Sequence, residues 1–191
     1  MATELKPTSW RTARALANSD RLHLMQLVSA AMGARGVSEL AAAADIPIPT
    51  ASIYLRALNA RGLVNVVRVG PYVYYGTGSD RSLPVAASIQ KSFASLFARK
   101  DLPDDWTARL LPLLRAYSSP RREAIVRTLV KARSIRYDEF RRLSGMCTTT
   151  FLRNLGKLLD AGIVVRDTEG FYSLAKPQNS LAAAFLAACQ S

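Results

Sequence analysis

The sequence predicts a mainly α-helical protein with small β-hairpins, an α+β fold in which one structural unit occurs twice. The first observation is a repeat at a spacing of 100 residues. Matching pairs are Leu55 and Leu155, Leu58 and Leu158, Gly62 and Gly162, Val64 and Val164, Gly70 and Gly170, and Tyr72 and Tyr172. The second observation is that apolar residues at helical spacing precede Gly62 and Gly162, whereas β-rich runs follow them. The ungapped register extends over about 40 residues, which indicates a duplicated unit.

In the first copy we expect three helices followed by a two-stranded hairpin. The helices are expected over 20–33, 38–44 and 49–61, and the strands over 63–69 and 72–75. Pro47 and Pro49 separate the second helix from the third, because each disfavours the α conformation in the residue before it. Gly62 ends the third helix, and Gly70-Pro71 forms the turn between the strands.

The second copy predicts the same order of elements. Its helices are expected over 120–133, 137–143 and 148–161, and its strands over 163–167 and 171–175. A further helix follows each copy, over 82–99 and 180–189, and Trp10 and Trp106 each open another helical stretch. Helix, helix, turn, helix and hairpin is the order of a winged helix-turn-helix. The sequence therefore predicts two tandem winged helix-turn-helix domains, over 1–80 and 116–191, joined by a helical linker over 81–115.

The composition is that of a folded and strongly basic protein. The 191 residues are 49% hydrophobic and carry 26 Lys and Arg against 14 Asp and Glu, a net charge of +12. The excess is spread along the chain, which favours a polyanion partner, double-stranded DNA above all. A basic surface that only aids solubility is the alternative. No apolar run is long enough to cross a membrane, and the N-terminal residues lack the apolar segment of a signal peptide, so we expect a cytoplasmic protein.

Four motifs occur within residues 15–76: an opening "ALA…RL…LV", a "VSELA" helix, an "LxxLxxxGLV" helix exit and a "VYY" return strand. With these motifs the first copy resembles winged helices of the arsenic-repressor (ArsR) type. The resemblance implies a DNA-binding regulator of transcription. Metal-sensing members carry cysteines in the helix after "SEL", or His, Asp and Glu clusters on the terminal helices. Here that helix reads "LAAAAD" and His23 stands alone, so we expect no metal and no cofactor.

The two cysteines, Cys147 and Cys189, have neither the spacing of a metal site nor a disulfide framework. Both are expected to be reduced, buried side chains.

The third helix of each copy is the candidate for reading DNA, because a recognition helix places its N-terminal residues at base edges in the major groove. In the second copy, Phe151, Leu155 and Leu158 form the expected core stripe. The residues expected to face outward are Thr148, Thr149, Arg153 and Asn154, with Lys157 further along. Arginine suits guanine and asparagine suits adenine. A solvated polar helix face is the alternative.

The first copy offers a different set at the same place. Its candidates are Thr50, Ser52, Tyr54 and Arg56, and its expected apolar stripe is Ala51, Ile53, Leu55 and Leu58. Ile53 takes the position that matches Arg153, so direct base reading by this copy is in doubt. Tyr54 is expected either to contact a thymine methyl group or a phosphate, or to pack.

Basic residues outside these helices are candidates for phosphate contacts. Arg68 lies in the first hairpin without a neighbouring acid, whereas Asp167 and Glu169 at the tip of the second hairpin would repel phosphate. Arg121 and Arg122, at the start of the helix over 120–133, are the preferred candidates in a basic run over 115–142. The first hairpin is thus expected to grip DNA better, and the second recognition helix to read it better.

The linker is too apolar for an exposed tether. Its large apolar residues are Phe93, Leu96, Phe97, Leu110, Leu111, Leu113 and Leu114. We expect them to pack between the copies and to form an intramolecular pseudo-dimer that binds an asymmetric site. A homodimer that buries Leu181, Phe185 and Leu186 of the C-terminal helix remains an alternative.

Three other functions compete with a transcription regulator. An enzyme is not expected, because the sequence has no paired carboxylates beside a glycine-rich loop, no nucleophile elbow and no usable histidine base. A neutral or acidic recognition face would favour a non-catalytic assembly module of tandem winged helices, whereas the net charge of +12 and the Thr, Arg and Asn face argue against it. A replication initiator with two winged helices is the third alternative.

Overall fold

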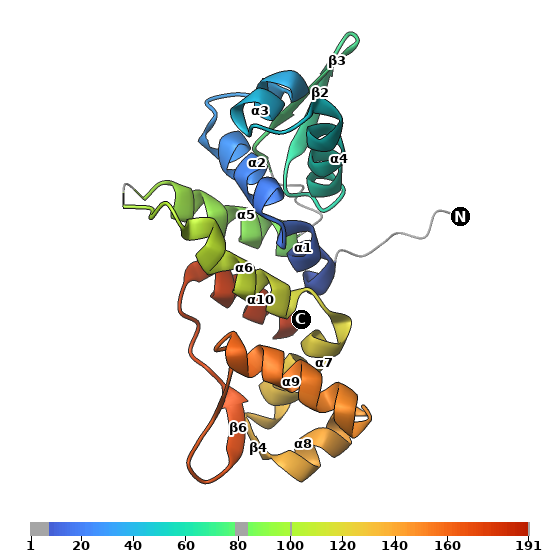
Figure 1. Cartoon of the computed structure of the whole chain (residues 1–191), viewed down its shortest axis with the longest axis vertical. Helices are drawn as coiled ribbons and strands as arrows, with labels where there is room; N and C mark the ends of the chain where they lie inside the picture. Colours follow the sequence, from blue (N-terminus) through green and yellow to red (C-terminus); the bar gives the residue numbers. More distant parts are fainter. Residues whose placement is uncertain (1–7, 79–83, 100, 191) are drawn as a thin grey trace, which may run out of the picture.

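The computed structural model describes residues 8–78, 84–99 and 101–190. Two similar units lie at the ends of an elongated molecule, and further helices lie between them (Figure 1). The first unit consists of α2 (Ser19–Ala30), β1 (Arg35–Gly36), α3 (Val37–Ala43), α4 (Ile48–Asn59), β2 (Asn65–Val69) and β3 (Tyr72–Gly76). The second unit consists of α7 (Pro120–Ala132), β4 (Ser134–Arg136), α8 (Tyr137–Ser144), α9 (Thr148–Asp160), β5 (Val164–Arg166) and β6 (Phe171–Leu174). The central helices are α1 (Ser9–Leu16), α5 (Pro84–Phe97), α6 (Trp106–Tyr117) and α10 (Ser180–Gln190).

The expected helices and hairpin strands are present, and their ends differ from the expected ones by about three residues at most. Each unit also has a strand that the sequence does not predict. The sheets have the antiparallel orders β1-β3-β2 and β4-β6-β5. β1 and β4 are too short to carry an alternating pattern, and they form only because β3 and β6 offer them a free edge.

The backbone repeats as well as the sequence. Asp45 and Gly145 follow α3 and α8 with φ of 53° and 66°, and Gly62 and Gly162 follow α4 and α9 with φ of 66° and 64°. A left-handed residue after each helix reverses the chain toward the next element. The units therefore use the same turns at matching positions.

The register shifts within the hairpins. Tyr72 pairs with Val69 next to a two-residue turn and is 66% exposed. Tyr172 instead pairs with Ile135 of β4 and is buried, as Tyr75 pairs with Arg35 of β1 and is buried. The second hairpin is shorter, so the structural counterpart of Tyr172 is Tyr75 and the expected match with Tyr72 is wrong.

Each unit buries the inner faces of its helices in its own part of the core. In the second unit Phe140 packs edge to face against Phe151, with ring centroids 5.1 Å apart. In the first unit Ala51, Leu55 and Leu58 of α4 are fully buried, whereas Ile53 is 57% exposed. Ile53 lies about 200° around the helix from Ala51, so its expected place in the apolar stripe is wrong.

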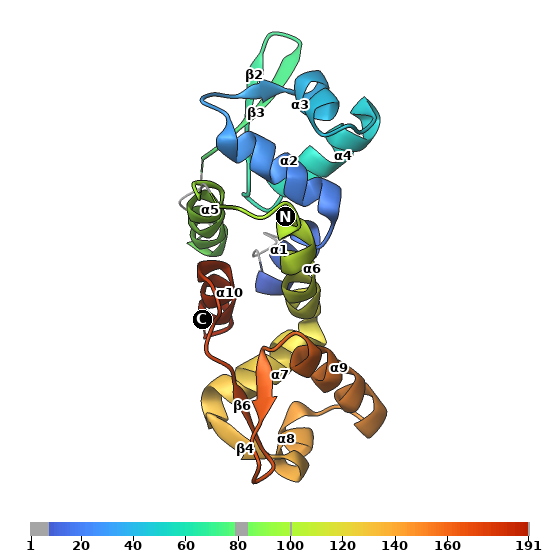
Figure 2. The same cartoon turned by 60° about the vertical axis from the view of Figure 1, so that its left-hand side comes forward.

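The central helices join the two units through one continuous core. α1 packs against α6, α5 packs against α2 and α10, and α10 packs against α7 (Figure 2). Phe93, Leu110 and Leu114 are buried, and Leu96, Phe97, Leu111 and Leu113 are partly buried against the same core. The expected burial of these linker side chains is therefore confirmed.

The C-terminal helix packs inside the chain. Leu181 and Phe185 are buried, and Phe185 stacks on Tyr117 with ring centroids 5.2 Å apart. Leu186 is partly buried against the same core. α10 thus already packs against α5 and α7 within one chain, and a homodimer through this helix stays an untested alternative.

No helix in the described residues is both long and apolar enough to span a membrane. Over the same residues, no cluster of three or more His, Cys, Asp or Glu side chains could hold a metal ion.

Candidate nucleic-acid interface

The N-terminal part of α9 presents a polar face to solvent. Phe151, Leu155 and Leu158 are buried and fix the rotation of the helix. The exposed side chains of α9 include Thr148, Thr149, Arg153 and Lys157. These four lie on the outward face, as the helical spacing indicates.

Asn154 does not face outward. It is 5% exposed, its Nδ2 donates to the Thr150 carbonyl at 2.7 Å, and its Oδ1 accepts from Arg122 Nη1 at 3.4 Å. Asn154 lies about 60° around the helix from Phe151, at the border of the core stripe, where the neighbouring helix decides whether a residue is covered. The expected outward orientation of Asn154 is therefore wrong.

Arg122 is occupied by the protein itself. Its guanidinium donates to the carbonyls of Ala116 and Arg115 at the C-terminal end of α6, and burial lowers its pKa. It stabilises carbonyl groups that the helix leaves unpaired. Arg121, the preceding residue, is exposed and is the freer of the two for a phosphate.

The matching face of the first unit is more apolar. Ile53 is exposed at the position of Arg153, and Ile48 at the start of α4 is 54% exposed. Thr50 and Ser52 are half-buried, and the exposed Arg56 donates from Nε to the Ser52 carbonyl at 3.2 Å. Tyr54 packs under the guanidinium of Arg21, whose Cζ lies 5.4 Å from the ring centroid. This contact agrees with the expectation that Tyr54 packs.

The two hairpins also differ. Arg68 is exposed on β2 among the exposed Val67, Val69 and Tyr72. In the second hairpin the Asp167 carboxylate accepts from the backbone amides of Glu169 at 3.0 Å and Phe171 at 2.8 Å. Asp167 thus shapes its own loop, a role that the sequence does not reveal.

The structure forms a cleft lined by four arginines that the sequence does not predict. Arg11 and Arg14 of α1, Arg21 of α2 and Arg61 after α4 line it. Within the described residues none of the four forms an ion pair, and Nε of Arg21 is buried without a hydrogen-bond partner. Burial also lowers the pKa of Arg21. Four unpaired cations around one cleft form a candidate site for an anion.

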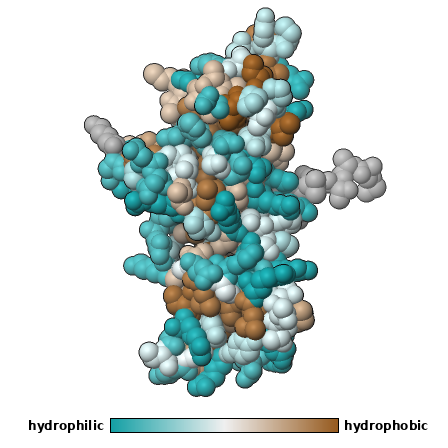
Figure 3. Space-filling model, in the orientation of Figure 1, coloured by the Kyte–Doolittle hydropathy of each residue, from teal (hydrophilic) through white to brown (hydrophobic). Residues whose placement is uncertain are grey.

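α4 and α9 lie on the same side of the long axis, with α6 between them (Figure 2). α1, which carries two of the cleft arginines, lies between α4 and the second unit (Figure 1). The surface in this orientation mixes hydrophilic area with apolar patches on both units (Figure 3). The two candidate reading helices and the arginine cleft are thus parts of one elongated molecule.

Cys147 is exposed at the position before α9, so its expected burial is wrong. Its contact with the Thr150 hydroxyl at 3.2 Å lowers the pKa of its thiol. Cys189 is buried, as expected, and burial raises its pKa to about 11.

Residues 22–68, which run from α2 into β2, match the IclR helix-turn-helix domain family. The chain therefore contains a helix-turn-helix, a class of DNA-binding domain. The match is to the IclR domain, and the resemblance to the ArsR type is not confirmed. The chain is 36% identical over 80 residues to the HTH-type transcriptional regulator Rv0324 of Mycobacterium tuberculosis. This alignment covers 42% of the chain and 34% of the relative, about a third of that protein. No solved structure matches the chain.

Proposed function

We propose that the chain is a sequence-specific double-stranded DNA-binding regulator of transcription, in which two winged helices act as a pseudo-dimer. The observation that carries the proposal is that two units with the same order of elements present α4 and α9 on one side of the molecule. The helix-turn-helix match in the first unit and a relative named as a transcriptional regulator support it.

In this proposal α9 reads bases in the major groove. Arg153 lies two residues beyond the buried Phe151, on the opposite side of the helix. Its guanidinium can donate two N–H groups to O6 and N7 of a guanine. Thr148 and Thr149 at the start of the helix reach bases or phosphates, and Lys157 reaches a phosphate.

The first unit reads a different half-site. Ile53 takes the place of Arg153, and an exposed aliphatic side chain in the major groove favours the methyl group of thymine. Thr50, Ser52 and Arg56 then contact the backbone around it. The preferred site is therefore asymmetric, with a guanine read by the second unit and a thymine read by the first.

Phosphate contacts come from Arg68 on the first hairpin, from Arg121 and from the arginine cleft. Nε of Arg21 is buried without a partner, so a phosphate oxygen in the cleft would satisfy it. Such contacts position the chain without reading sequence. The domain division 1–80, 81–115 and 116–191 belongs to the same proposal, with the central helices holding both units.

The test is selection of bound duplexes from a random library, followed by footprinting and light scattering on the shortest bound duplex. We expect an asymmetric footprint and a mass of one chain per duplex. Two chains on a palindrome would overturn the pseudo-dimer, whereas the absence of any enriched sequence would overturn sequence-specific binding.

A non-catalytic assembly module is the second candidate. It is favoured by the exposed apolar side chains of the first unit, which are Ile48, Ile53, Val67, Val69 and Tyr72. These would be expected at a protein interface. Loss of DNA binding in the selection, together with a stable complex with another protein, would favour this candidate.

A further inference from the structure

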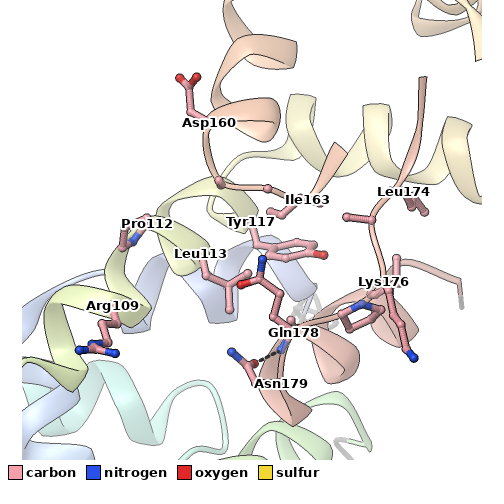
Figure 4. A pocket seen from close by; sticks show the side chains of 16 residues that line it. Arg109, Pro112, Leu113, Tyr117, Asp160, Ile163, Leu174, Lys176, Gln178 and Asn179 are labelled. Carbon is pink, nitrogen blue, oxygen red and sulfur yellow. Dashed lines mark hydrogen bonds between the residues drawn. The ribbon is translucent and has the colours of Figure 1, made fainter. Parts of the chain in front are cut away.

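A cavity of about 150 Å³ lies between the second unit and the central helices, and α9 reaches it only at its last residue, Asp160 (Figure 4). Its walls come from α6, the turn after α9, β6 and the start of α10. The side chains that define it are Leu113, Tyr117, Ile163, Leu174, Gln178 and Leu186. The cavity is therefore bounded by elements that are far apart in sequence, and only the tertiary fold creates it.

Tyr117 supplies a buried polar group to this cavity. The residue is 3% exposed, and its hydroxyl points toward the segment that carries Leu174 and Lys176 (Figure 4). Within the described residues the hydroxyl forms no hydrogen bond. Burial raises the pKa of Tyr117, so the group stays a neutral donor. The hydroxyl is not among the fully enclosed unpaired polar atoms of the described residues, so it is open to the cavity and can donate to a molecule that enters it.

The remaining walls determine what can bind. Leu113, Ile163, Leu174 and Leu186 are apolar, and the amide of Gln178 lies beside the Tyr117 ring (Figure 4). Three charged residues lie at the rim: Asp160 extends away from the cavity, Lys176 extends away from Tyr117, and Arg109 pairs with Asp105 at 2.7 Å. A cavity of roughly this volume, with apolar side chains on several of its walls, admits a single benzene-sized ring.

We propose that this cavity binds a small neutral molecule with one ring and one oxygen, the oxygen hydrogen-bonded to the Tyr117 hydroxyl. The apolar walls contact the ring, and the amide of Gln178 offers a second hydrogen bond. A phenol or a cyclic ketone has this chemistry. A carboxylate fits less well, because the two cations of the lining, Arg109 and Lys176, extend away from Tyr117 and would leave its charge unpaired there.

The location gives such a ligand a means of regulation. Ile163 and Leu174 belong to the second unit, whereas Leu113, Tyr117 and Leu186 belong to central helices. A ligand between them favours one orientation of the unit that carries α9, and its binding should therefore change the affinity for DNA. This step rests on the proposed function, but the binding itself does not.

The test uses the full chain with 4-methylphenol, toluene and benzoate as probes. We expect 4-methylphenol to raise the melting temperature more than toluene at equal concentration, and benzoate to leave it unchanged. Tyr117→Phe keeps the ring that stacks on Phe185 and should weaken 4-methylphenol binding by roughly fivefold while sparing toluene. Tyr72→Phe, on the exposed hairpin, is the matched control and should bind as the parent does.

The proposed site would be overturned if 4-methylphenol did not raise the melting temperature. It would also be overturned if Tyr117→Phe preferred 4-methylphenol over toluene as strongly as the parent does. Binding of 4-methylphenol without any change in the affinity for a selected duplex would overturn only the regulatory step. If the chain binds 4-methylphenol but no duplex, the proposed function is wrong and the ligand site is still supported.

Discussion

The Glu123 carboxylate on α7 accepts a 2.6 Å hydrogen bond from the hydroxyl of Ser9 on α1, although 114 residues separate them. The same carboxylate accepts from the backbone amide of Trp10 at 3.1 Å and pairs with Arg127 at 3.0 Å. Glu123 therefore takes the place of a capping residue at the N-terminal end of α1, where negative charge is stabilised. Because Glu123 is buried, it fixes the first central helix to the second unit.

Glu123→Gln should destabilise the chain by about 1–3 kcal/mol, because it replaces a charged acceptor of several hydrogen bonds in a buried position. Urea unfolding measures the effect. Glu139→Gln is the matched control, since Glu139 is exposed and lies 3.8 Å from Arg142; its change should be close to zero. Equal effects of the two substitutions would show that the contacts of Glu123 with α1 do not stabilise the chain.

Affinity for duplex DNA should fall steeply as salt rises. Each phosphate contacted by Lys or Arg releases counterions and contributes about 0.9 to the log–log slope. Electrophoretic shifts from low to physiological salt measure it. A slope near zero would contradict contacts with the DNA backbone and would favour the protein-assembly candidate.

Arg153→Ala should weaken binding to the preferred duplex by about 1–3 kcal/mol and relax preference at one base, as expected for a guanine contact. Arg68→Ala, in contrast, should weaken all duplexes alike. Binding of a matched set of duplexes that differ at single bases separates the two effects. If Arg153→Ala weakens every duplex equally, Arg153 contacts a phosphate and does not read sequence.

Arg14→Ala and Arg61→Ala should each lower the salt slope by about 1 without changing sequence preference, because cleft arginines contact phosphate only. Arg99→Ala serves as the control, because Arg99 already pairs with Asp101 at 2.7 Å on an exposed surface. Its slope should equal that of the parent. Unchanged slopes for Arg14→Ala and Arg61→Ala would exclude the cleft from the DNA interface.

The two thiols should react at very different rates. Cys147 is exposed and its pKa is lowered, so more of it is thiolate at pH 8, whereas Cys189 is buried with a pKa raised to about 11. Iodoacetamide at pH 8 followed by mass spectrometry should label Cys147 first. Denatured protein, in which both should react, is the reference. Equal labelling rates in the folded chain would contradict the burial of Cys189.

The sequence by itself determined the order of elements and the duplication. Helical spacing placed Leu55, Leu58, Leu155 and Leu158 on the buried faces of two helices, and the glycines after α4 and α9 marked the ends of both helices. These are local signals: the 3.6-residue period and the left-handed conformation depend on residues close together in the chain. The outward position of Arg153 follows from them as well, because it lies opposite the apolar stripe.

Only the tertiary structure decided what lies at the borders of those stripes and between the units. Asn154 became buried because α7, with Arg122, packs against α9, and β1 and β4 formed because β3 and β6 offered them an edge. The arginine cleft and the Tyr117 cavity each combine side chains from separate elements. No period within one element predicts such sites, because each depends on how distant segments pack against one another.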